Sequence, residues 1–320
     1  MTRALIGSRR GRLVGALLLA AGIVLPFVVY PVLAIDIAAY AIFAVAFDLL
    51  LGFAGLLSFG HALFWGGAGY VVTILMARAH APLLAAGAVA VAYAAVCAFL
   101  VGGLAIRTAG IYFAMITLAL AQLQYFFAYQ LSDVTGGENG LQLAGRGSIA
   151  GIDLNDDRLF YYLVLIVATL AVLLVIRVVR SPFGFALEAA RDNEQRAIAL
   201  GYRVNRYKLA TFVFSGTLAG VAGVLFATGN RLAGLDGVDW HTSGKIVMMT
   251  ILGGISTIFG PIVGATVFEA LEYFVSKTLV GDKTNLIMGT IFAIVILVAR
   301  RGIVGEILAR GGSVRAKRSP

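Results

Sequence analysis

Charge is the scarcest property of this sequence. Only 13% of its 320 residues are Asp, Glu, Lys or Arg, whereas 60% are hydrophobic. A soluble chain of this length needs more charge to cover its surface, so the composition indicates a polytopic membrane protein. In such a protein the net charge of +9 reports the orientation of the loops, and we do not expect nucleic-acid binding.

Residues that build covalent and metal frameworks are also few. The single cysteine, Cys97, lies in an apolar run, which excludes a disulfide framework and favours a packing role. The three histidines, His61, His80 and His241, have no paired metal-ligand spacing. We therefore expect no metal site and no cofactor in this chain.

Catalytic and energy-converting motifs are missing as well. A phosphate-binding loop needs glycines that let backbone N–H groups wrap the phosphates, followed by Lys and then Ser or Thr. The nearest stretch, Gly237 to Lys245, has a different glycine spacing and is followed by Ile246. The paired acid–base residues of a membrane-embedded hydrolase are not found either. We predict that the chain is not an enzyme and is driven by a separate ATPase or by an ion gradient.

Apolar runs fill most of the chain and predict an all-α protein that crosses a lipid bilayer many times. Arginines precede the first run, at 13–33, which is long enough to span and lacks a small-residue cleavage site. We interpret it as a retained helix whose basic end is cytoplasmic. Further spans are expected near 37–51, 56–77, 83–106, 111–130, 159–176, 209–228, 246–268 and 286–299.

The loops between these spans predict their orientation. The loop at 131–157 is acidic and belongs outside, whereas the basic segment at 181–203 belongs in the cytoplasm. The basic tail at 300–320 is cytoplasmic only if the number of crossings is even. The sequence thus predicts a single membrane domain over 1–320, with nine to ten helices, about ten in our interpretation, and both termini in the cytoplasm.

The extra crossing is expected at 246–275, where Gly253-Gly254 and Gly260-Pro261 interrupt the apolar run. Proline and paired glycines break helices, and broken backbone at membrane depth needs protein or a cavity around it. A discontinuous hairpin at this place leaves three acidic residues outside, namely Glu269, Glu272 and Asp282.

A second interrupted segment, Gly52 to Tyr70, lies in the first half of the chain. Interruptions at corresponding places in two halves are typical of an internal repeat, here an inverted one, with a substrate path near the midplane. We therefore place Ser58, His61, Gly254 and Ser256 on a candidate translocation path. The glycines can instead serve close helix packing. His61 can likewise be a hydrogen-bonded packing residue.

Two polar residues in the span at 111–130 extend the candidate path. Thr117 and Gln124 are seven residues apart and share one helix face, which we expect to turn away from lipid. Direct substrate contact and helix–helix hydrogen bonding are both consistent with this face.

An ion-coupled secondary transporter is the rival class. Such proteins hold ionisable residues inside their spans, and the candidates here are Asp48 and His61. Asp48 is expected to cap or pair near the cytoplasmic end of its helix.

The segment from Ser181 to Gly201 belongs to the longest densely charged island in the chain. Ser181 is a suitable N-cap, Pro182 suits the first helical position and Gly201 is a natural stop, while Asp192-Asn193 divides the segment into two short helices. Its apolar residues, Phe183, Leu187, Ala190, Ala197 and Ile198, fall on helical spacing. We expect a docking surface for a soluble partner.

Four blocks in this order resemble one known family. They are LLGFAGLLSFGHALFWGGAGY at 50–70, VTGGENGL at 134–141, SPFGFALEAARDNEQRAIALGYRVNRYKLATFVFSGTLAGVAGVLFA at 181–227 and SGKIVMMTILGGISTIFGPIVGA at 243–265. Together they are similar to the LivM-type permease subunits of bacterial ABC importers for branched-chain amino acids. The resemblance implies a multi-pass protein of the bacterial cytoplasmic (inner) membrane.

The resemblance also implies partners. These are a second, LivH-like permease or a second copy of this chain, two cytoplasmic ATPase subunits that use the ATP, and a periplasmic substrate-binding protein. The island at 181–203 would supply the coupling helix that enters an ATPase groove. Its charged and polar residues are Glu188, Arg191, Asp192, Asn193, Glu194 and Arg196.

The turn Thr135-Gly136-Gly137-Glu138 in the outer loop is a candidate docking site for the binding protein, and a simple flexible turn is the alternative. Leucine, isoleucine and valine are the substrates that the resemblance implies. Other amino acids, or urea and small amides, are the alternatives within the same class.

Overall fold

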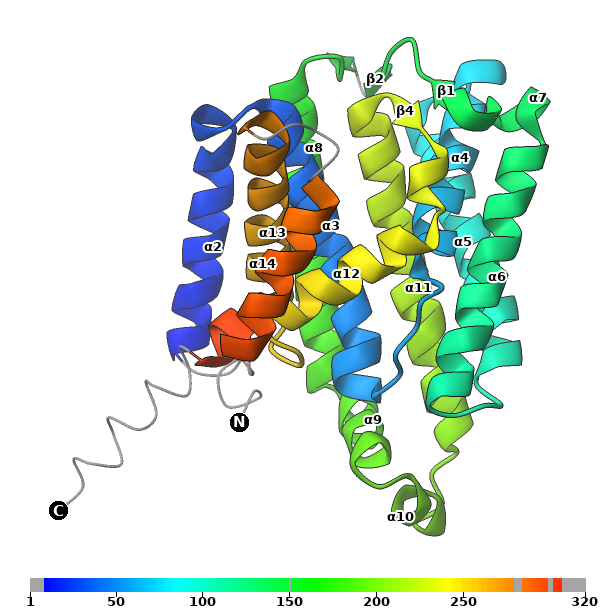
Figure 1. Ribbon diagram of the computed structural model, residues 1–320, viewed down its shortest axis with the longest axis vertical. Helices are drawn as coiled ribbons and strands as arrows, with labels where there is room; N and C mark the ends of the chain where they lie inside the picture. Colours follow the sequence, from blue (N-terminus) through cyan, green and yellow to red (C-terminus); the bar gives the residue numbers. More distant parts are fainter. Residues whose placement is uncertain (1–8, 150, 279–283, 299–301, 307–320) are drawn as a thin grey trace, which may run out of the picture.

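The computed structural model describes residues 9–149, 151–278, 284–298 and 302–306, which are mostly helical (Figure 1). The α-helices are α2 (Arg9–Val28), α3 (Pro31–Asp48), α4 (His61–Arg78), α5 (Leu83–Ala105), α6 (Ile111–Gln130), α7 (Ser132–Thr135), α8 (Asp157–Arg180), α9 (Pro182–Asp192), α10 (Glu194–Ala199), α11 (Val204–Asn230), α12 (Trp240–Gly253), α13 (Phe259–Thr278) and α14 (Thr284–Val298). The described residues also form a π-helix, η1 (Leu49–Phe53), two 3₁₀ turns, η2 (Gly137–Asn139) and η3 (Leu235–Gly237), and a short helical segment at 302–306.

Four two-residue strands lie in the connections. The strand β1 (Leu141–Gln142) pairs antiparallel with β4 (Leu232–Ala233), and β2 (Ser148–Ile149) pairs antiparallel with β3 (Ile152–Asp153). The β1–β4 pair joins the loop after α7 to the segment after α11, so both connections meet at the upper end of Figure 1.

Within the described residues, five helices are long and apolar enough to cross a membrane: α3 with η1, α5, α6, α8 and α11. Their burial separates a centre from a periphery. The share of buried residues is 89% in α3 with η1 and 61% in α11, against 28% in each of α5, α6 and α8. The apolar part of α2 is shorter, at Leu13–Val28. The molecule is therefore built around α3 and α11, which pack against each other.

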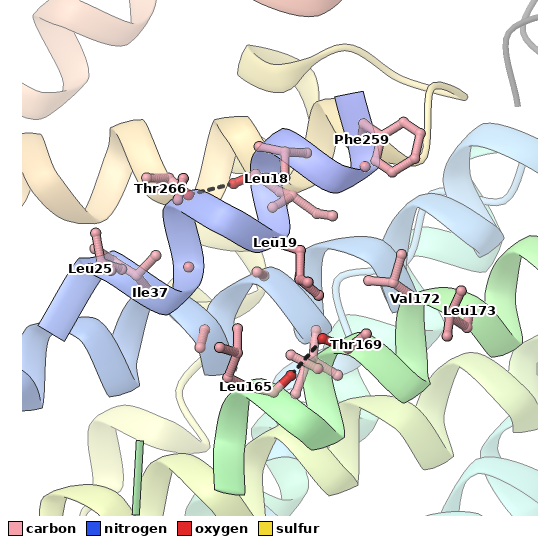
Figure 2. Close-up of a pocket in the computed structure, with 18 of the residues that line it drawn as sticks. Leu18, Leu19, Leu25, Ile37, Leu165, Thr169, Val172, Leu173, Phe259 and Thr266 are labelled. Atoms are coloured by element: carbon pink, nitrogen blue, oxygen red, sulfur yellow. Dashed lines mark hydrogen bonds between the residues drawn. The ribbon is translucent and has the colours of Figure 1, made fainter. Parts of the chain in front are cut away.

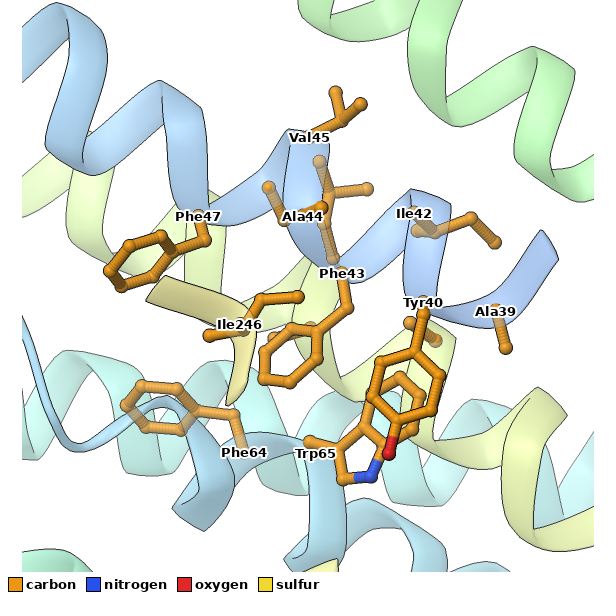
Figure 3. Close-up of a cluster of buried hydrophobic side chains, with 14 of the residues drawn as sticks. Ala39, Tyr40, Ile42, Phe43, Ala44, Val45, Phe47, Phe64, Trp65 and Ile246 are labelled. Atoms are coloured by element: carbon orange, nitrogen blue, oxygen red, sulfur yellow. The ribbon is translucent and has the colours of Figure 1, made fainter. Parts of the chain in front are cut away.

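Aromatic side chains fill the centre (Figure 3). Tyr40 and Phe43 of α3 stack on Trp65 of α4, with ring centroids 4.8 and 4.6 Å apart. Phe226 of α11 lies 5.0 Å from the same Trp65 ring. Each of these rings removes a large apolar surface from its surroundings, so this cluster fixes α3, α4 and α11 relative to one another.

Two helices begin in the middle of the molecule (Figure 1). The chain leaves η1 at the lower end, rises in an extended segment through Leu56 to Gly60, and starts α4 only then. The chain leaves α11 at the upper end, descends through β4 and η3, and then starts α12. The first break lies within the predicted interruption at Gly52 to Tyr70. The second break, before α12, precedes the predicted interruption at 253–261. That interruption is instead the turn between α12 and α13.

The region at 246–275 therefore differs in detail from the expected hairpin. It contains two helices, α12 and α13, joined by a turn at 254–258 that lies towards the lower end of Figure 1. Glu269 and Glu272 are not in an outer loop but within α13, where Glu269 is buried. Asp282 lies outside the described residues, as does the tail at 300–320 apart from 302–306.

Candidate functional site

His61, the first residue of α4, joins three helices at the first break. Its Nδ1 is 3.1 Å from Ser58 Oγ and its Nε2 is 2.9 Å from Ser215 Oγ of α11. Ser215 Oγ donates to the carbonyl of Ala46 in α3 at 2.5 Å, so it accepts from His61. The hydrogen-bond pattern therefore places the ring proton on Nε2 and satisfies both nitrogens.

Thr117 and Gln124 hold α6 against the same break, which explains why they share a face. Thr117 Oγ1 accepts from the backbone N–H of Phe59 at 3.2 Å. The Gln124 side-chain amide donates to the carbonyl of Leu63 at 3.0 Å. Its Oε1 accepts from the hydroxyl of Tyr93 in α5 at 3.4 Å. The expected inward orientation is confirmed, and the contacts in this structure are of the helix–helix kind.

The first turns of the two broken helices touch each other. The backbone N–H of Ala62 in α4 donates to Ser243 Oγ in α12 at 2.9 Å. One turn further along α4, a Cβ on Gly66 would come within 2.4 Å of the Gly237 backbone in η3. Only glycine permits this approach. The amino-terminal ends of α4 and α12 therefore meet in the interior of the molecule.

Gly254 and Ser256, expected on the same path, lie elsewhere. Both belong to the turn between α12 and α13, which packs on the end of α3. Ser256 N donates to Asp48 Oδ1 at 2.7 Å and Ser256 Oγ donates to the Gly52 carbonyl at 2.7 Å. The six candidate path residues thus fall into two groups, one at the first break and one at the turn between α12 and α13. Asp48 pairs at the end of its helix, as expected.

The turn is also bound to the charged island. Arg191 of α9 donates through Nη1 to the Gly52 carbonyl, and the same atom is 3.3 Å from Ser256 Oγ. A Cβ on Gly55, where φ is +71°, would come within 2.8 Å of the Arg191 side chain. Arg191 therefore points inward and links α9 to both η1 and the turn at 254–258.

The island has the predicted two-helix form. Asn193 separates α9 from α10 and accepts from Arg196 N at 2.9 Å, and Gly201 follows α10 with φ at +88°. Ser181 precedes α9 as expected, but its hydroxyl donates to the Val178 carbonyl at 2.6 Å and does not cap the helix. Lys208 of α11 pairs with Glu194 at 2.7 Å. The island is thus tied to the following long helix.

The remaining island residues are more exposed. Asp192 forms an exposed ion pair with Arg191 at 3.0 Å, Arg196 is exposed and Glu188 is half-buried. The expected apolar face is only partly buried, because Ile198 is 56% exposed. Phe185 and Leu200 are exposed as well. These three exposed apolar side chains all belong to the island and are here called the tip patch as a group.

The candidate docking turn at 135–138 has a defined shape. Thr135 is buried, donates to the Ala128 carbonyl at 2.6 Å and accepts from Gly137 N at 3.3 Å. Gly136 and Gly137 have φ of 81° and 59°, which favours glycine. Glu138 has the exposed side chain of the four predicted residues, so it alone offers a charged group to a partner.

A buried charge cluster was missed by sequence reasoning. Lys245 Nζ of α12 lies 2.7 Å from Glu269 and 2.6 Å from Glu272 of α13, and 4.4 Å from the centre of the Tyr40 ring. Near the start of α3, Asp36 accepts from the Asn230 side chain at 2.6 Å. The available signal was a lysine beside an apolar run, which is costly in a membrane unless it is paired.

No solved structure matches the chain. A family described as "Branched-chain amino acid transport system / permease component" matches residues 32–299. The chain is 26% identical over 291 residues to the high-affinity branched-chain amino acid transport system permease protein LivM of Escherichia coli K12, covering 83% of this chain and 67% of that relative. It is 24% identical over 286 residues to LivH of the same organism, covering 83% and 91%.

A shorter similarity, 29% over 124 residues, links it to the xylose transport system permease protein XylH of Haemophilus influenzae, covering 37% of this chain and 33% of that relative. Transport permeases of this kind are multi-pass membrane proteins and not enzymes. Because the family match extends over most of the chain, this protein belongs to the family of permease components of branched-chain amino acid transport systems.

Proposed function

We propose that the chain is a LivM-type permease subunit of an ATP-binding-cassette importer. It forms the translocation path for branched-chain amino acids by alternating access, driven by separate ATPase subunits. Its assembly includes a LivH-like permease or a second copy, two ATPases and a periplasmic binding protein in the bacterial inner membrane. The family match and the similarity to both LivM and LivH support this assignment.

The order of the described long helices, α2–α6, α8 and α11–α14, supports about ten crossings. The start of α2, the island at 181–203 and residues 302–306 lie towards the lower end, and the acidic loop at 131–157 lies at the upper end. With the basic end in the cytoplasm, the positive-inside rule is satisfied at each of these places. Both termini are then cytoplasmic, and 131–157 is the periplasmic loop.

The packing of the helices supports an inverted repeat of α2–α6 with α8 and α11–α14. In this repeat α3 corresponds to α11, α4 to α12 and α5 to α13. The α3–α13 contact then corresponds to the α11–α5 contact, and the contact of the broken helix α4 with α11 corresponds to that of the broken helix α12 with α3. Each half therefore has a broken helix that starts in the interior. We place the translocation path beside these two amino-terminal ends, whose dipoles favour a substrate carboxylate. Ser58, His61, Thr117 and Gln124 hold the first break in position there.

Two features of the island support a coupling role. The tip patch of Phe185, Ile198 and Leu200 offers an apolar docking surface where a soluble ATPase can reach it. Arg191 carries the connection inward, to Gly52 and to Ser256. A displacement of α9 therefore acts on the end of α3 and on the α12–α13 turn together. Gly254 and Ser256 belong to this coupling link in our account.

The buried ion cluster favours a second candidate, an ion-coupled transporter, because Lys245, Glu269 and Glu272 lie within helices. Uptake of labelled leucine into proteoliposomes separates the two. We expect uphill uptake only when the ATPases, the second permease, the binding protein and ATP are all present. Uphill uptake by the purified chain alone, driven by a proton or sodium gradient, would contradict the importer.

A ligand screen of the binding protein distinguishes leucine, isoleucine and valine from other amino acids, urea and amides.

A further inference from the structure

A long cleft lies between α2, α3, α8 and α13 (Figure 2), with a volume of about 550 Å³. Leu18 of α2, Ile37 of α3 and Val172 of α8 are among the side chains that line it. Along α8 it extends from Tyr161 to Arg180, about 28 Å at 1.5 Å per residue, close to the ~30 Å of a bilayer's hydrocarbon core. Because about 550 Å³ extends over about 28 Å, the cleft is long and narrow.

The walls of the cleft offer apolar contact. The hydroxyl groups that line it donate hydrogen bonds to backbone carbonyls, either in their own helix or, for Tyr161 of α8, in α2. Thr169 donates to Leu165 O and Thr266 to Ile262 O, both at 2.8 Å, and Tyr161 donates to Gly22 O at 2.5 Å. An occupant gains nothing by offering polar groups here, so a hydrocarbon chain fits better than a polar solute.

The cleft opens where a membrane protein meets lipid. Leu19 of α2 and Leu173 of α8 line it and are 41% and 55% exposed. Leu17 and Leu170, beside them on the same helices, are more exposed still. In a multi-pass membrane protein, such an apolar exposed surface faces acyl chains or a neighbouring apolar subunit.

One charged side chain, Arg180, stands at the end of the cleft near the charged island. It is exposed, and within the described residues no ion pair or hydrogen bond of its side chain is found. Its neighbour Arg177 is also exposed but does not line the cleft. A guanidinium at the mouth of an apolar cleft is complementary to a phosphate attached to a hydrocarbon chain.

We propose that this cleft is a binding site for an anionic phospholipid, with an acyl chain between α2 and α8 and the phosphate on Arg180. The charge complementarity at Arg180 selects a lipid over an uncharged apolar surface of a second permease. The site does not involve the two broken helices, and the proposal stands independently of the transported substrate.

Native mass spectrometry of the detergent-purified chain tests the site. The chain is incubated with phosphatidylglycerol or phosphatidylcholine, and retained lipid is counted. We expect preferential retention of phosphatidylglycerol, reduced about five-fold by Arg180→Gln, since one basic side chain near the headgroups contributes about that factor. Arg177→Gln is the matched control and should keep most of the retention.

A second pair of variants tests the apolar part. Ala16→Trp places a large side chain at the lining of the cleft, whereas Ala20→Trp places one on the same exposed helix outside the lining. We expect only Ala16→Trp to reduce the retention of phosphatidylglycerol. Equal thermal stability of the two variants is the control for folding. Equal effects within either pair would refute the site. Loss of assembly with a second permease in Ala16→Trp, with unchanged lipid retention, would instead assign the cleft to a subunit interface.

Discussion

Arg146 stabilises the upper end of the molecule from a position inside the outer loop. Its side chain is 1% exposed, pairs with Asp157 at 2.7 Å and donates to the carbonyls of Thr228 and Gly229 at 3.1 and 2.5 Å. It thereby adds hydrogen bonds to backbone carbonyls in the last turn of α11, where helical partners run out. A single cation thus joins the loop, α8 and α11.

We predict that Arg146→Ala lowers the free energy of unfolding by about 1–3 kcal/mol, because it removes the hydrogen bonds of a buried cation to backbone carbonyls and its pair with the partly exposed Asp157. Chemical denaturation in detergent, followed by circular dichroism, measures the change. Arg107→Ala, at an exposed site, should remain within about 0.5 kcal/mol of the wild type. Equal stability of the two variants would show that Arg146 is not structurally important.

Gly66 provides a second test at the residue scale. A Cβ at this position would enter the backbone of Gly237, so Gly66→Ala must separate α4 from η3. We expect a loss of about 1–3 kcal/mol, typical of overpacking. Gly103→Ala, at a helical site with nothing within 4 Å, should be neutral or stabilising by up to about 1 kcal/mol. A stable Gly66→Ala variant would contradict the close contact between the two breaks.

Which residues could be predicted depends on where their partners lie in the chain. Helical spacing alone placed Thr117 and Gln124 on one face, and they bind Phe59 just before α4 and Leu63 within it. Lys245 and Arg146 could not be interpreted in this way. The partners of Lys245 are on another helix, and the α11 carbonyls that Arg146 binds are more than eighty residues away.

At the scale of elements, turn chemistry was the most informative signal. Asn193 and Gly201 ended α9 and α10 at the predicted places. Helical spacing did not indicate the exposure of Ile198, because α10 contains only six residues and its orientation is set by its ties to α9 and α11. The break before α12 was also missed, since β4 and η3 are specified by pairing with β1 and by contact with Gly66.

The tip patch yields a prediction for Ile198→Asp. A buried carboxylate at an interface without a partner is costly, so we expect at least a tenfold loss in affinity for the ATPase subunit. Co-purification and surface plasmon resonance measure the loss. Ile152→Asp, equally exposed at 56% but in the opposite loop, serves as the control and should bind normally. Normal binding by Ile198→Asp would place the ATPase contact elsewhere.

At the scale of the whole molecule, the charge pattern predicts which ends face which compartment. With the native thiol removed by Cys97→Ala, Ile198→Cys and Ile152→Cys supply one exposed reporter at each end of Figure 1. We expect an impermeant maleimide applied to intact spheroplasts to label Ile152→Cys, and to label Ile198→Cys only after the membrane is opened. The reverse pattern would invert the topology and remove the coupling role of α9.

Our central claim is that ATPase motion reaches the membrane helices through Arg191. The most direct measurement is the number of leucine molecules imported per ATP hydrolysed by the reconstituted importer. We predict that Arg191→Gln, which loses the charged hydrogen bonds to Gly52 and Ser256, lowers this ratio about tenfold while the ATPase stays bound. Arg107→Gln, at an exposed site outside the island, should keep the wild-type ratio. An unchanged ratio in Arg191→Gln would contradict the account.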